Sequence, residues 1–550
     1  MSTFKRRLSW LLLAVGVIAL GSVMLRPPRY IGPVGERPPD IVKPDALIRS
    51  YSLSKLPADL LRIPLAKDVL TEDFVAYYEE NKDRMAISGA LRRIAFEHKQ
   101  DLSDKLLDAA LDEPAEVALW RDEAGRLQDF AVVLRLNALA RALRTILPAI
   151  AKASDLQLST AGKLDDSDVD ILVLEYRPEH RLLLLAKGER VVVLSNPAML
   201  LLPNPDKKEN WPQSEDAVTF IKALLDNGET VSPFARHFLI DQPLPEKNHS
   251  LTLGTPSFAL GYESFIPGLA ALDLTFDNTG KWQSQVLLNS EAAQNNGIWN
   301  ALPYGASLCA ALPVDWAQME GLLKTFDSHE RNQQDPAALL AANFSGAAAI
   351  CWYQNSRLYT PLFAARLKSN ANAEQVQTFF SLFDRMVNGN HQEDADAADT
   401  LRAHKIASRF GSPGQGTTER SLNPAIAIKG DAVFFSPDVM LVESALKVAA
   451  KNYPALSDGF NGSRESTLLF IAPDALANLL KKEVFAALPV DQESVFRDAA
   501  EVYLSPRFYA LARYPAQRVK LAPIKQTRLN QEDDTRVWWP LVWEATKTAN

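Results

Sequence analysis

Beyond its first 25 residues, this 550-residue chain has two serine–lysine pairs whose types and spacing could support nucleophilic chemistry. Ser52 with Lys55, and Ser444 with Lys447, both fit the pattern Ser-x-x-Lys, in which the lysine can act as the base for a serine nucleophile. The second pair lies on a predicted helix, where residues three apart share a face. Penicillin-binding enzymes also carry Ser-Asp-Asn or Lys-Thr-Gly, and neither string occurs here. Because Ser-x-x-Lys arises easily by chance in a long chain, we assign no catalytic residue.

Two further stretches resemble binding loops but lack the residues that would complete them. The glycine-rich stretch from Gly411 to Thr418 could present backbone amides to an anion, but it holds no lysine to approach a phosphate. We interpret it as a hairpin tip. The acidic run from Glu393 to Asp399 offers oxygen ligands but lacks the glycine and final glutamate of a calcium loop, so a solvated charge cluster is the better interpretation. We therefore predict no metal ligand, no cofactor-binding residue and no cofactor.

The histidines and cysteines do not form a recognisable catalytic or metal motif. No HExxH, CxxC, GxSxG, Walker or strand-to-helix GxGxxG pattern is present. Cys309 and Cys351 are the two cysteines, and both sit in apolar predicted strands. They are either a disulfide formed in an oxidising compartment or two buried small hydrophobic side chains. The seven histidines show no i, i+4 pairing: His98, His180, His237, His249, His329, His391 and His404.

The apolar run Leu8 to Leu25 indicates where the chain lies relative to a membrane. It is uncharged, follows Lys5-Arg6-Arg7, and as a helix of eighteen residues would span roughly 27 Å, close to the hydrocarbon thickness of a bilayer. We predict a transmembrane anchor at 8–25 behind a cytoplasmic basic stub at 1–7, a single pass through the inner membrane with the bulk of the chain in the periplasm. The alternative is a cleaved signal peptide, with small residues around Ala19 and Gly21. We favour the anchor because the run continues to Leu25.

The segment after the anchor, 26–44, holds six prolines. Such a composition favours extended polyproline geometry, so we predict a semi-rigid stalk that ends where the folded part begins, near Asp45.

Repeated strings predict the fold. A strand hairpin followed by a helix is predicted at 116–152 and again at 347–387, and each is followed by a matched Lys-Gly-acid turn and apolar strand, at 187–197 and 429–437. The offset is roughly 230 to 240 residues, which suits an internal duplication. We predict an α+β fold of two pseudo-repeated halves, 45–245 and 246–550, with mainly antiparallel sheets covered by helices behind the transmembrane helix. Pro540 would place the strand 536–543 at a sheet edge.

Composition excludes several classes of function. With 47% hydrophobic and 23% charged residues the chain matches globular averages. Its net charge of −8 lacks the basic footprint that a phosphate backbone requires, so nucleic acid is not an expected partner.

The opening block carries a family resemblance. Leu56-Pro57, Asp59-Leu60-Leu61 and above all the string from Lys67 to Phe74, followed by Ala118-Leu119-Trp120-Arg121, resemble the YfaA-like family of unknown function. These are bacterial envelope proteins often encoded beside alpha-2-macroglobulin-like proteins. The resemblance covers the whole chain and implies a periplasmic setting and an envelope protein partner. It implies no catalytic residues.

Two functions remain in view. The first is a membrane-anchored periplasmic binding or scaffold protein, which follows from the anchor, the stalk and the incomplete catalytic motifs. The second is a periplasmic hydrolase or peptidoglycan-acting enzyme with a site between the halves, which would require a cleft with convergent polar groups of perturbed pKa.

Overall fold

The computed structural model describes about three fifths of the chain, which divides into two compact units. The first unit comprises Met1–Leu260 with Ala271–Ser284, and the second comprises Gly261–Ala270 with Gln285–Asn550. The described residues are 40–69, 112–122, 127–135, 157–165, 167–177, 180–203, 211–226, 231–243, 246–258, 268–289, 297–314, 316, 343–370, 372–388, 401–403, 406–410, 418–460, 466–486, 493–523 and 536–546.

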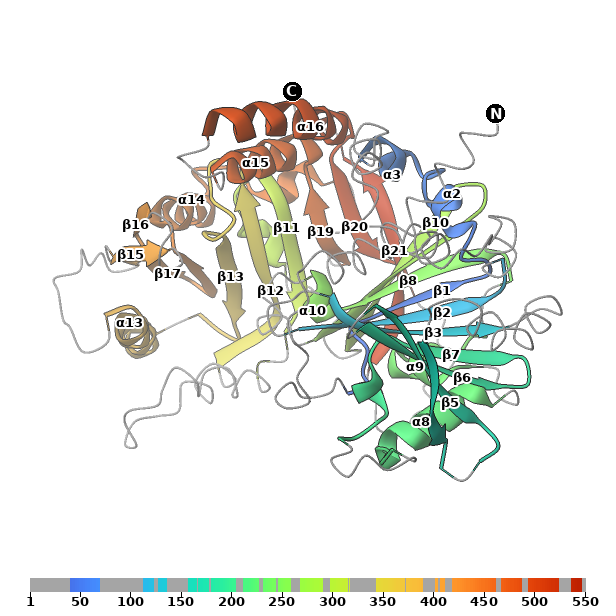
Figure 1. Cartoon of the computed structure of the whole chain (residues 1–550). Coiled ribbons are helices and arrows are strands. Elements are labelled where there is room, and N and C mark those ends of the chain that lie inside the picture. The colour runs from blue at the N-terminus through green and yellow to red at the C-terminus, as the bar shows by residue number, and fades with distance from the viewer. Residues whose placement is uncertain are drawn as a thin grey trace. The chain divides into compact units, whose positions relative to one another are not determined.

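Strands of the first unit pair antiparallel in the order β9-β8-β1-β2-β3-β7-β6-β5-β4 (Figure 1). Their alternation of buried and half-buried side chains, as in Leu127–Arg135, reflects the period of two that turns successive residues to opposite faces. The strand bounds are β1 Ala46–Ser50, β2 Ala115–Arg121, β3 Leu127–Arg135, β4 Gln157–Lys163, β5 Asp170–Arg177, β6 His180–Lys187, β7 Arg190–Leu194, β8 Asn248–Gly254 and β9 Leu269–Asp277.

Short helices pack on the strands of the first unit. Leu56 and Ile63, from the segment of α2 and α3, join a core with Ile48, Leu119 and Phe276 from the strands. Helix α8 begins after Ser214 with two acidic residues in its first turn, where a carboxylate meets the positive end of the helix dipole. The helix bounds are α2 Leu56–Leu60, α3 Pro64–Val69, α8 Glu215–Leu225, α9 Pro233–His237 and α10 Thr255–Phe258, with a 3-10 turn, η2, at Pro197–Met199.

The second unit pairs its strands antiparallel in the order β10-β21-β20-β19-β11-β12-β13-β18-β17-β14. Strands β15 and β16 form a separate two-stranded sheet. The strand bounds are β10 Trp282–Asn289, β11 Ala306–Pro313, β12 Phe344–Tyr353, β13 Leu362–Leu367, β14 Leu401–Ala403, β15 Ile406–Phe410, β16 Thr418–Leu422, β17 Ala425–Lys429, β18 Ala432–Ser436, β19 Thr467–Ile471, β20 Gln517–Leu521 and β21 Arg536–Ala545.

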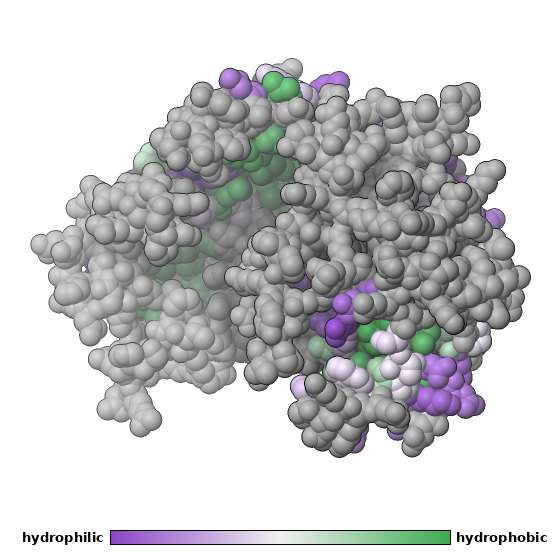
Figure 2. Space-filling view, in the orientation of Figure 1, coloured by the Kyte–Doolittle hydropathy of each residue, from purple (hydrophilic) through white to green (hydrophobic). Residues whose placement is uncertain are grey.

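Helices of the second unit cover parts of these strands. Helix α14 packs on β17 and β18. Helix α15 packs on β11 and β12, and its fully buried Leu479 lies in a core cluster with Ile350 and Trp352 of β12. Helices α15 and α16 lie against each other (Figure 1). Figure 2 shows hydrophobic residues where Figure 1 places β11 to β13. The helix bounds are α13 Ala373–Asn388, α14 Val439–Ala449, α15 Pro473–Ala486 and α16 Glu493–Ala512, with 3-10 turns η5 at Ile298–Asn300 and η6 at Leu456–Gly459.

The predicted hairpins and Lys-Gly-acid turns are present. Gly188 connects β6 to β7 at a φ of 59°, and Gly430 connects β17 to β18 at 63°. Both values lie in the left-handed region that glycine adopts without a steric penalty, which is why each string has glycine there. Within each unit taken by itself, the strand after this turn pairs with the second strand of a hairpin, β7 with β3 and β18 with β13. The duplication itself stays a prediction, as does the division at residues 245 and 246.

The predicted fold class is wrong. In place of separate sheets covered by helices in two α+β halves, nineteen of the described strands belong to one large sheet, and its registered strand pairs are antiparallel. The described residues include twenty-one strands and nine α-helices, several of only four to six residues. Local patterns identified the hairpins correctly but could not reveal that they join, because β1 pairs with β8 across about 200 residues of chain.

The predicted edge position of β21 is also wrong. β21 pairs with β20 on one side and with β10 on the other, and Pro540 lies opposite Gln285. Pro540 has no backbone N–H to donate, but β21 still has a partner strand on each side and is not an edge strand.

The predicted anchor, 8–25, lies outside the described residues. Among those that the structure does describe, no helix has the length and hydropathy to cross a bilayer. Residues 40–44, at the end of the predicted stalk, are described: Ile41 is buried, and the Trp120 indole N–H donates to the Asp40 carbonyl at 2.9 Å. The chain thus contacts the first unit before Asp45.

Candidate functional site

The first serine–lysine pair is held by a carboxylate. Ser52 Oγ donates to Asp112 Oδ1 at 2.6 Å, and Lys55 Nζ lies 2.6 Å from the same oxygen. Burial raises the pKa of Asp112, but the bonds from Lys55 and Ser52 outweigh it and hold that pKa below its ordinary value. In this arrangement Lys55 is the ion-pair partner of Asp112, and Ser52 directs its proton to the carboxylate.

The second pair lies on α14, as predicted. Ser444 Oγ donates to the carbonyl of Met440, one helical turn earlier, at 2.8 Å. This is the usual hydrogen bond of a serine within a helix, and it directs the hydroxyl proton to the backbone.

Several other predicted candidates lie outside the described residues. These are residues 411–417, the acidic run 393–399, and His98, His329, His391 and His404. In the described part, no group of three or more histidine, cysteine, aspartate or glutamate side chains is arranged to hold a metal.

Cys309 and Cys351 form a disulfide, which resolves the two alternatives left open by the sequence. They are directly opposite each other in the β11–β12 pair, with Cα atoms 4.1 Å apart. Both are fully buried in a core cluster of the second unit.

Sequence reasoning missed a buried polar network in the first unit, which links serine, histidine and aspartate. Ser50 and His249 are opposite each other in the β1–β8 register, and Ser50 Oγ lies 2.8 Å from His249 Nδ1. His249 Nε2 in turn lies 3.1 Å from Oδ2 of Asp59 on α2. Ser50 and His249 have no exposed surface, and Asp59 is 3% exposed.

Neighbouring groups complete this network. The Tyr51 hydroxyl donates to Asp59 Oδ2 at 2.8 Å, and Arg62 lies 3.2 Å from Asp59 Oδ1. The His249 ring contacts the rings of Tyr51 and Phe276, with centroids 4.6 and 5.1 Å away. Burial raises the pKa of Asp59, but hydrogen bonds from His249 and Tyr51, with the charge of Arg62, outweigh it and hold that pKa below its ordinary value. Burial and the bond to Asp59 raise the pKa of Tyr51.

The network differs from a hydrolase triad in two respects. In serine hydrolases the serine contacts Nε2 and the aspartate contacts Nδ1, whereas here these contacts are exchanged. Ser50 Oγ also accepts the backbone N–H of Ser52 at 3.0 Å. With the neutral Nε2–H tautomer, the hydroxyl of Ser50 donates to His249 and the ring donates to Asp59, so each group has a partner. The arrangement ties α2 to two neighbouring strands.

A second polar pair lies on the opposite face of β1. Arg49 Nε lies 3.2 Å from Glu116 Oε1, and Arg49 Nη2 donates to the carbonyl of Gln242 at 2.7 Å. Burial raises the pKa of Glu116, and the positive charge of Arg49 opposes that shift. A buried charge needs such a partner, so this pair joins β1 to β2.

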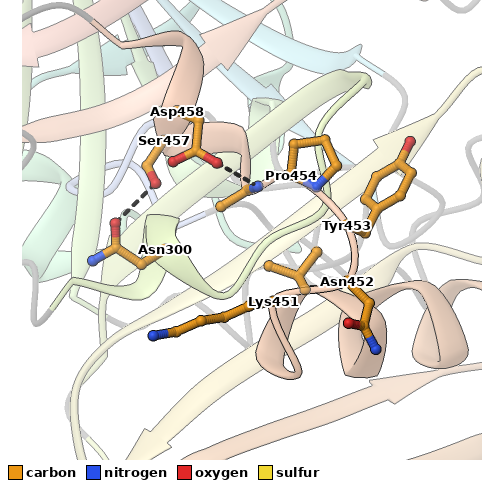
Figure 3. A pocket seen from close by; sticks show the side chains of 9 residues that line it. Asn300, Lys451, Asn452, Tyr453, Pro454, Ser457 and Asp458 are labelled. Carbon is orange, nitrogen blue, oxygen red and sulfur yellow. Dashed lines mark hydrogen bonds between the residues drawn. The ribbon is translucent and has the colours of Figure 1, made fainter.

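A surface cavity of about 590 Å³ lies in the second unit (Figure 3). It is lined by Asn300, Val448, Lys451, Asn452, Tyr453, Pro454, Ala455, Ser457 and Asp458. Two stretches about 150 residues apart build it, because Tyr304 N–H donates to the Pro454 carbonyl at 3.1 Å and Leu456 N–H donates to the Leu302 carbonyl at 2.8 Å. No sequence motif marks these residues.

Nothing in the sequence could have located either the network or the cavity from spacing alone. His249 is 190 residues from Asp59, and Asn300 is 157 residues from Ser457. The one local signal is the pair Pro57 and Asp59, because a proline and a carboxylate are typical of the first turn of a helix; it fits the start of α2 but does not reveal the partners of Asp59.

Comparisons with known proteins agree with the resemblance of the opening block. Residues 11–543 match the family described as "Uncharacterized protein conserved in bacteria (DUF2138)". The "Uncharacterized protein YfaA" of Escherichia coli (strain K12) is 30% identical over 568 residues, which cover 97% of this chain and 96% of that protein.

Two solved structures, crystal forms IV and III of TP0453, are also similar in part. Each is 11% identical to this chain. Form IV covers 45% of this chain and 77% of its own length with a TM-score of 0.20, and form III covers 55% and 91% with a TM-score of 0.22. The family match and the E. coli relative together confirm the predicted resemblance to YfaA-like proteins. The chain belongs to the DUF2138 family, an uncharacterized family of proteins conserved in bacteria.

Proposed function

We propose that this protein is a membrane-anchored envelope protein that acts outside the cytoplasm as a binding or scaffold module. The observation that carries the proposal is the disulfide between Cys309 and Cys351. Disulfides form and persist in oxidising compartments such as the bacterial periplasm and are rare in the cytosol. A crosslink between adjacent core strands therefore suits a domain that folds after export.

The export signal is the apolar run Leu8 to Leu25, preceded by three basic residues. Basic residues before such a run favour a cytoplasmic N-terminus, which directs everything after residue 25 to the opposite side. The proline-rich stretch from residue 26 to residue 39 then separates the folded part from the membrane surface.

A binding or scaffold role fits how the candidate nucleophiles are engaged. Ser52 donates to a carboxylate and Ser444 to a helix carbonyl. The partner we propose is an alpha-2-macroglobulin-like envelope protein, from the gene neighbourhood typical of the YfaA-like family. The partner would contact exposed apolar side chains such as Val502 and Tyr509 on α16, which are 66% and 69% exposed.

In-cell photocrosslinking tests this proposal. A photoreactive residue at Tyr509 should yield one dominant crosslinked envelope protein, identified by mass spectrometry, whereas the same residue at the fully buried Ile221 should crosslink only within the chain. Crosslinks from Tyr509 to cytosolic proteins would contradict the proposal, as would crosslinks confined to the chain itself.

A second candidate function, a periplasmic hydrolase, is favoured by one observation, the contact of Ser50 with His249 and Asp59. The complete burial of Ser50 argues against a hydrolase, because a serine nucleophile must reach its substrate. A fluorophosphonate probe, which labels activated serines, separates the two. We expect no labelling of the full-length protein; labelling that Ser50→Ala abolishes would establish the hydrolase.

A further inference from the structure

We infer that the cavity between η5 and the segment after α14 binds a neutral carbohydrate. The inference is independent of the proposed partner and concerns only the second unit. It follows from the size of the cavity, its rigid walls, its balanced polar lining and its exposed aromatic ring.

The cavity has the size and support of a ligand site. Its volume of about 590 Å³ falls within the range of small-molecule pockets. The wall that carries Asn300 is anchored by Trp299, which has no exposed surface and donates its indole N–H to the Thr467 carbonyl at 3.0 Å. Leu456, 1% exposed, anchors the opposite wall in the same core cluster. Rigid walls reduce the entropy that a ligand loses on binding.

Hydrogen bonds within the lining fix the orientation of its polar groups (Figure 3). The Ser457 hydroxyl donates to Asn300 Oδ1 at 2.8 Å, so the amide nitrogen of Asn300 points away from Ser457. Asp458 Oδ2 accepts the Ala455 N–H at 2.9 Å, which holds the carboxylate in place. Asn452 adds a second amide to this lining.

The charges of the lining favour a neutral ligand. Lys451 contributes one positive charge and Asp458 one negative charge, and the other lining residues are uncharged. An anion such as phosphate would meet the carboxylate, and a cation would meet the ammonium. Amide, ammonium and carboxylate groups together offer both donors and acceptors, which is what a ligand rich in hydroxyl groups requires.

Tyr453 supplies the apolar surface that a sugar ring needs. It is 45% exposed at the rim of the cavity. An aromatic ring offers a flat hydrophobic face to the C–H groups on one side of a pyranose, while the hydroxyls at the ring edge reach polar groups.

The backbone at Lys451 points to a use for its side chain. Lys451 follows the end of α14 with a φ of 61°, in the left-handed region where helices usually have glycine. A lysine there is strained, and residues in such conformations cluster at ligand sites.

Titration of the full-length protein with neutral tetrasaccharides of glucose and of N-acetylglucosamine tests the inference, read by saturation-transfer NMR and calorimetry. We expect one of them to bind, and Tyr453→Ala to weaken that binding about tenfold through loss of the ring contact. Met440→Ala removes an exposed apolar side chain of the same unit outside the cavity and should leave binding unchanged. Lys451→Gly, which suits the backbone there, should also weaken binding.

The inference would be overturned if neither tetrasaccharide bound, if Tyr453→Ala bound as tightly as the natural protein, or if inorganic phosphate bound in their place. Because Tyr453 is exposed and Lys451→Gly relieves strain, neither variant should unfold.

Discussion

Removing the Asp59 carboxylate should destabilise the first unit without affecting the second. In Asp59→Ala, His249 Nε2 loses its acceptor in a fully buried position, and the Tyr51 hydroxyl loses its acceptor at a half-buried one. A buried donor left without a partner costs about 1–3 kcal/mol. Arg62 is half exposed, so its ion pair adds about 1 kcal/mol or less. The expected loss is about 3 kcal/mol.

Two companion variants sharpen this prediction. Asp59→Asn keeps an oxygen acceptor but loses the charge, so it should cost about half as much as the alanine variant. Asp168→Ala makes the same charge change at a fully exposed side chain of the same unit and should change stability by less than about 0.5 kcal/mol.

Hydrogen exchange read by mass spectrometry is the appropriate assay, because it reports each unit separately. In Asp59→Ala, peptides from β1 and β8 should lose protection, while peptides from β11 and β12 should keep theirs. Equal protection of β1 in Asp59→Ala and the natural protein would refute the structural role of the network, and so would an equal loss of protection in Asp168→Ala.

Three further predictions concern the disulfide, the pH dependence and the left-handed lysine. The disulfide closes a loop between residues 42 apart in sequence, so replacing both cysteines by alanine should destabilise the second unit by up to about 4 kcal/mol. Amides of β11 and β12 should then lose protection from hydrogen exchange, and unchanged protection would contradict this prediction. Because the pKa of Asp59 is lowered in the folded protein, its stabilisation is present above its unfolded pKa, near 4, and is lost as pH falls through the folded value. Acid unfolding of the first unit should therefore be less steep in Asp59→Asn, and an unchanged profile would oppose the assignment. Lys451→Gly should raise stability by about 1 kcal/mol in denaturant titration, and a loss would show that φ is not the source of strain.

Local chemistry made the hairpins predictable, whereas the assembly of the sheet was not. Gly188 and Gly430 mark turns that neighbouring residues alone specify, and the strands beside them are where the apolar runs predict. The single large sheet depends on pairs such as β1 with β8, which sequence spacing does not encode. The same limit applies to Pro540, whose strand gains a partner in β10 that no local pattern indicates.

The polar sites were hidden for the same reason. Sequence spacing singled out Ser52 and Lys55, but their actual partner is Asp112, about 60 residues away. His249 was one of seven scattered histidines until β8 placed it opposite Ser50. For Cys309 and Cys351 the sequence left a disulfide and two buried thiols as alternatives, and the β11–β12 register resolves them by placing the two cysteines opposite each other.

The redox state of the cysteines in growing cells tests the proposed location most directly. Cells are quenched with acid, the protein is unfolded in detergent, and thiols are tagged with a maleimide that shifts gel mobility, before or after reduction. The proposal predicts that the full-length protein, in the membrane fraction, takes no tag before reduction and two after it, because Cys309 and Cys351 are paired. Two tags before reduction would mean that the chain folds in a reducing compartment, and the proposal would be wrong.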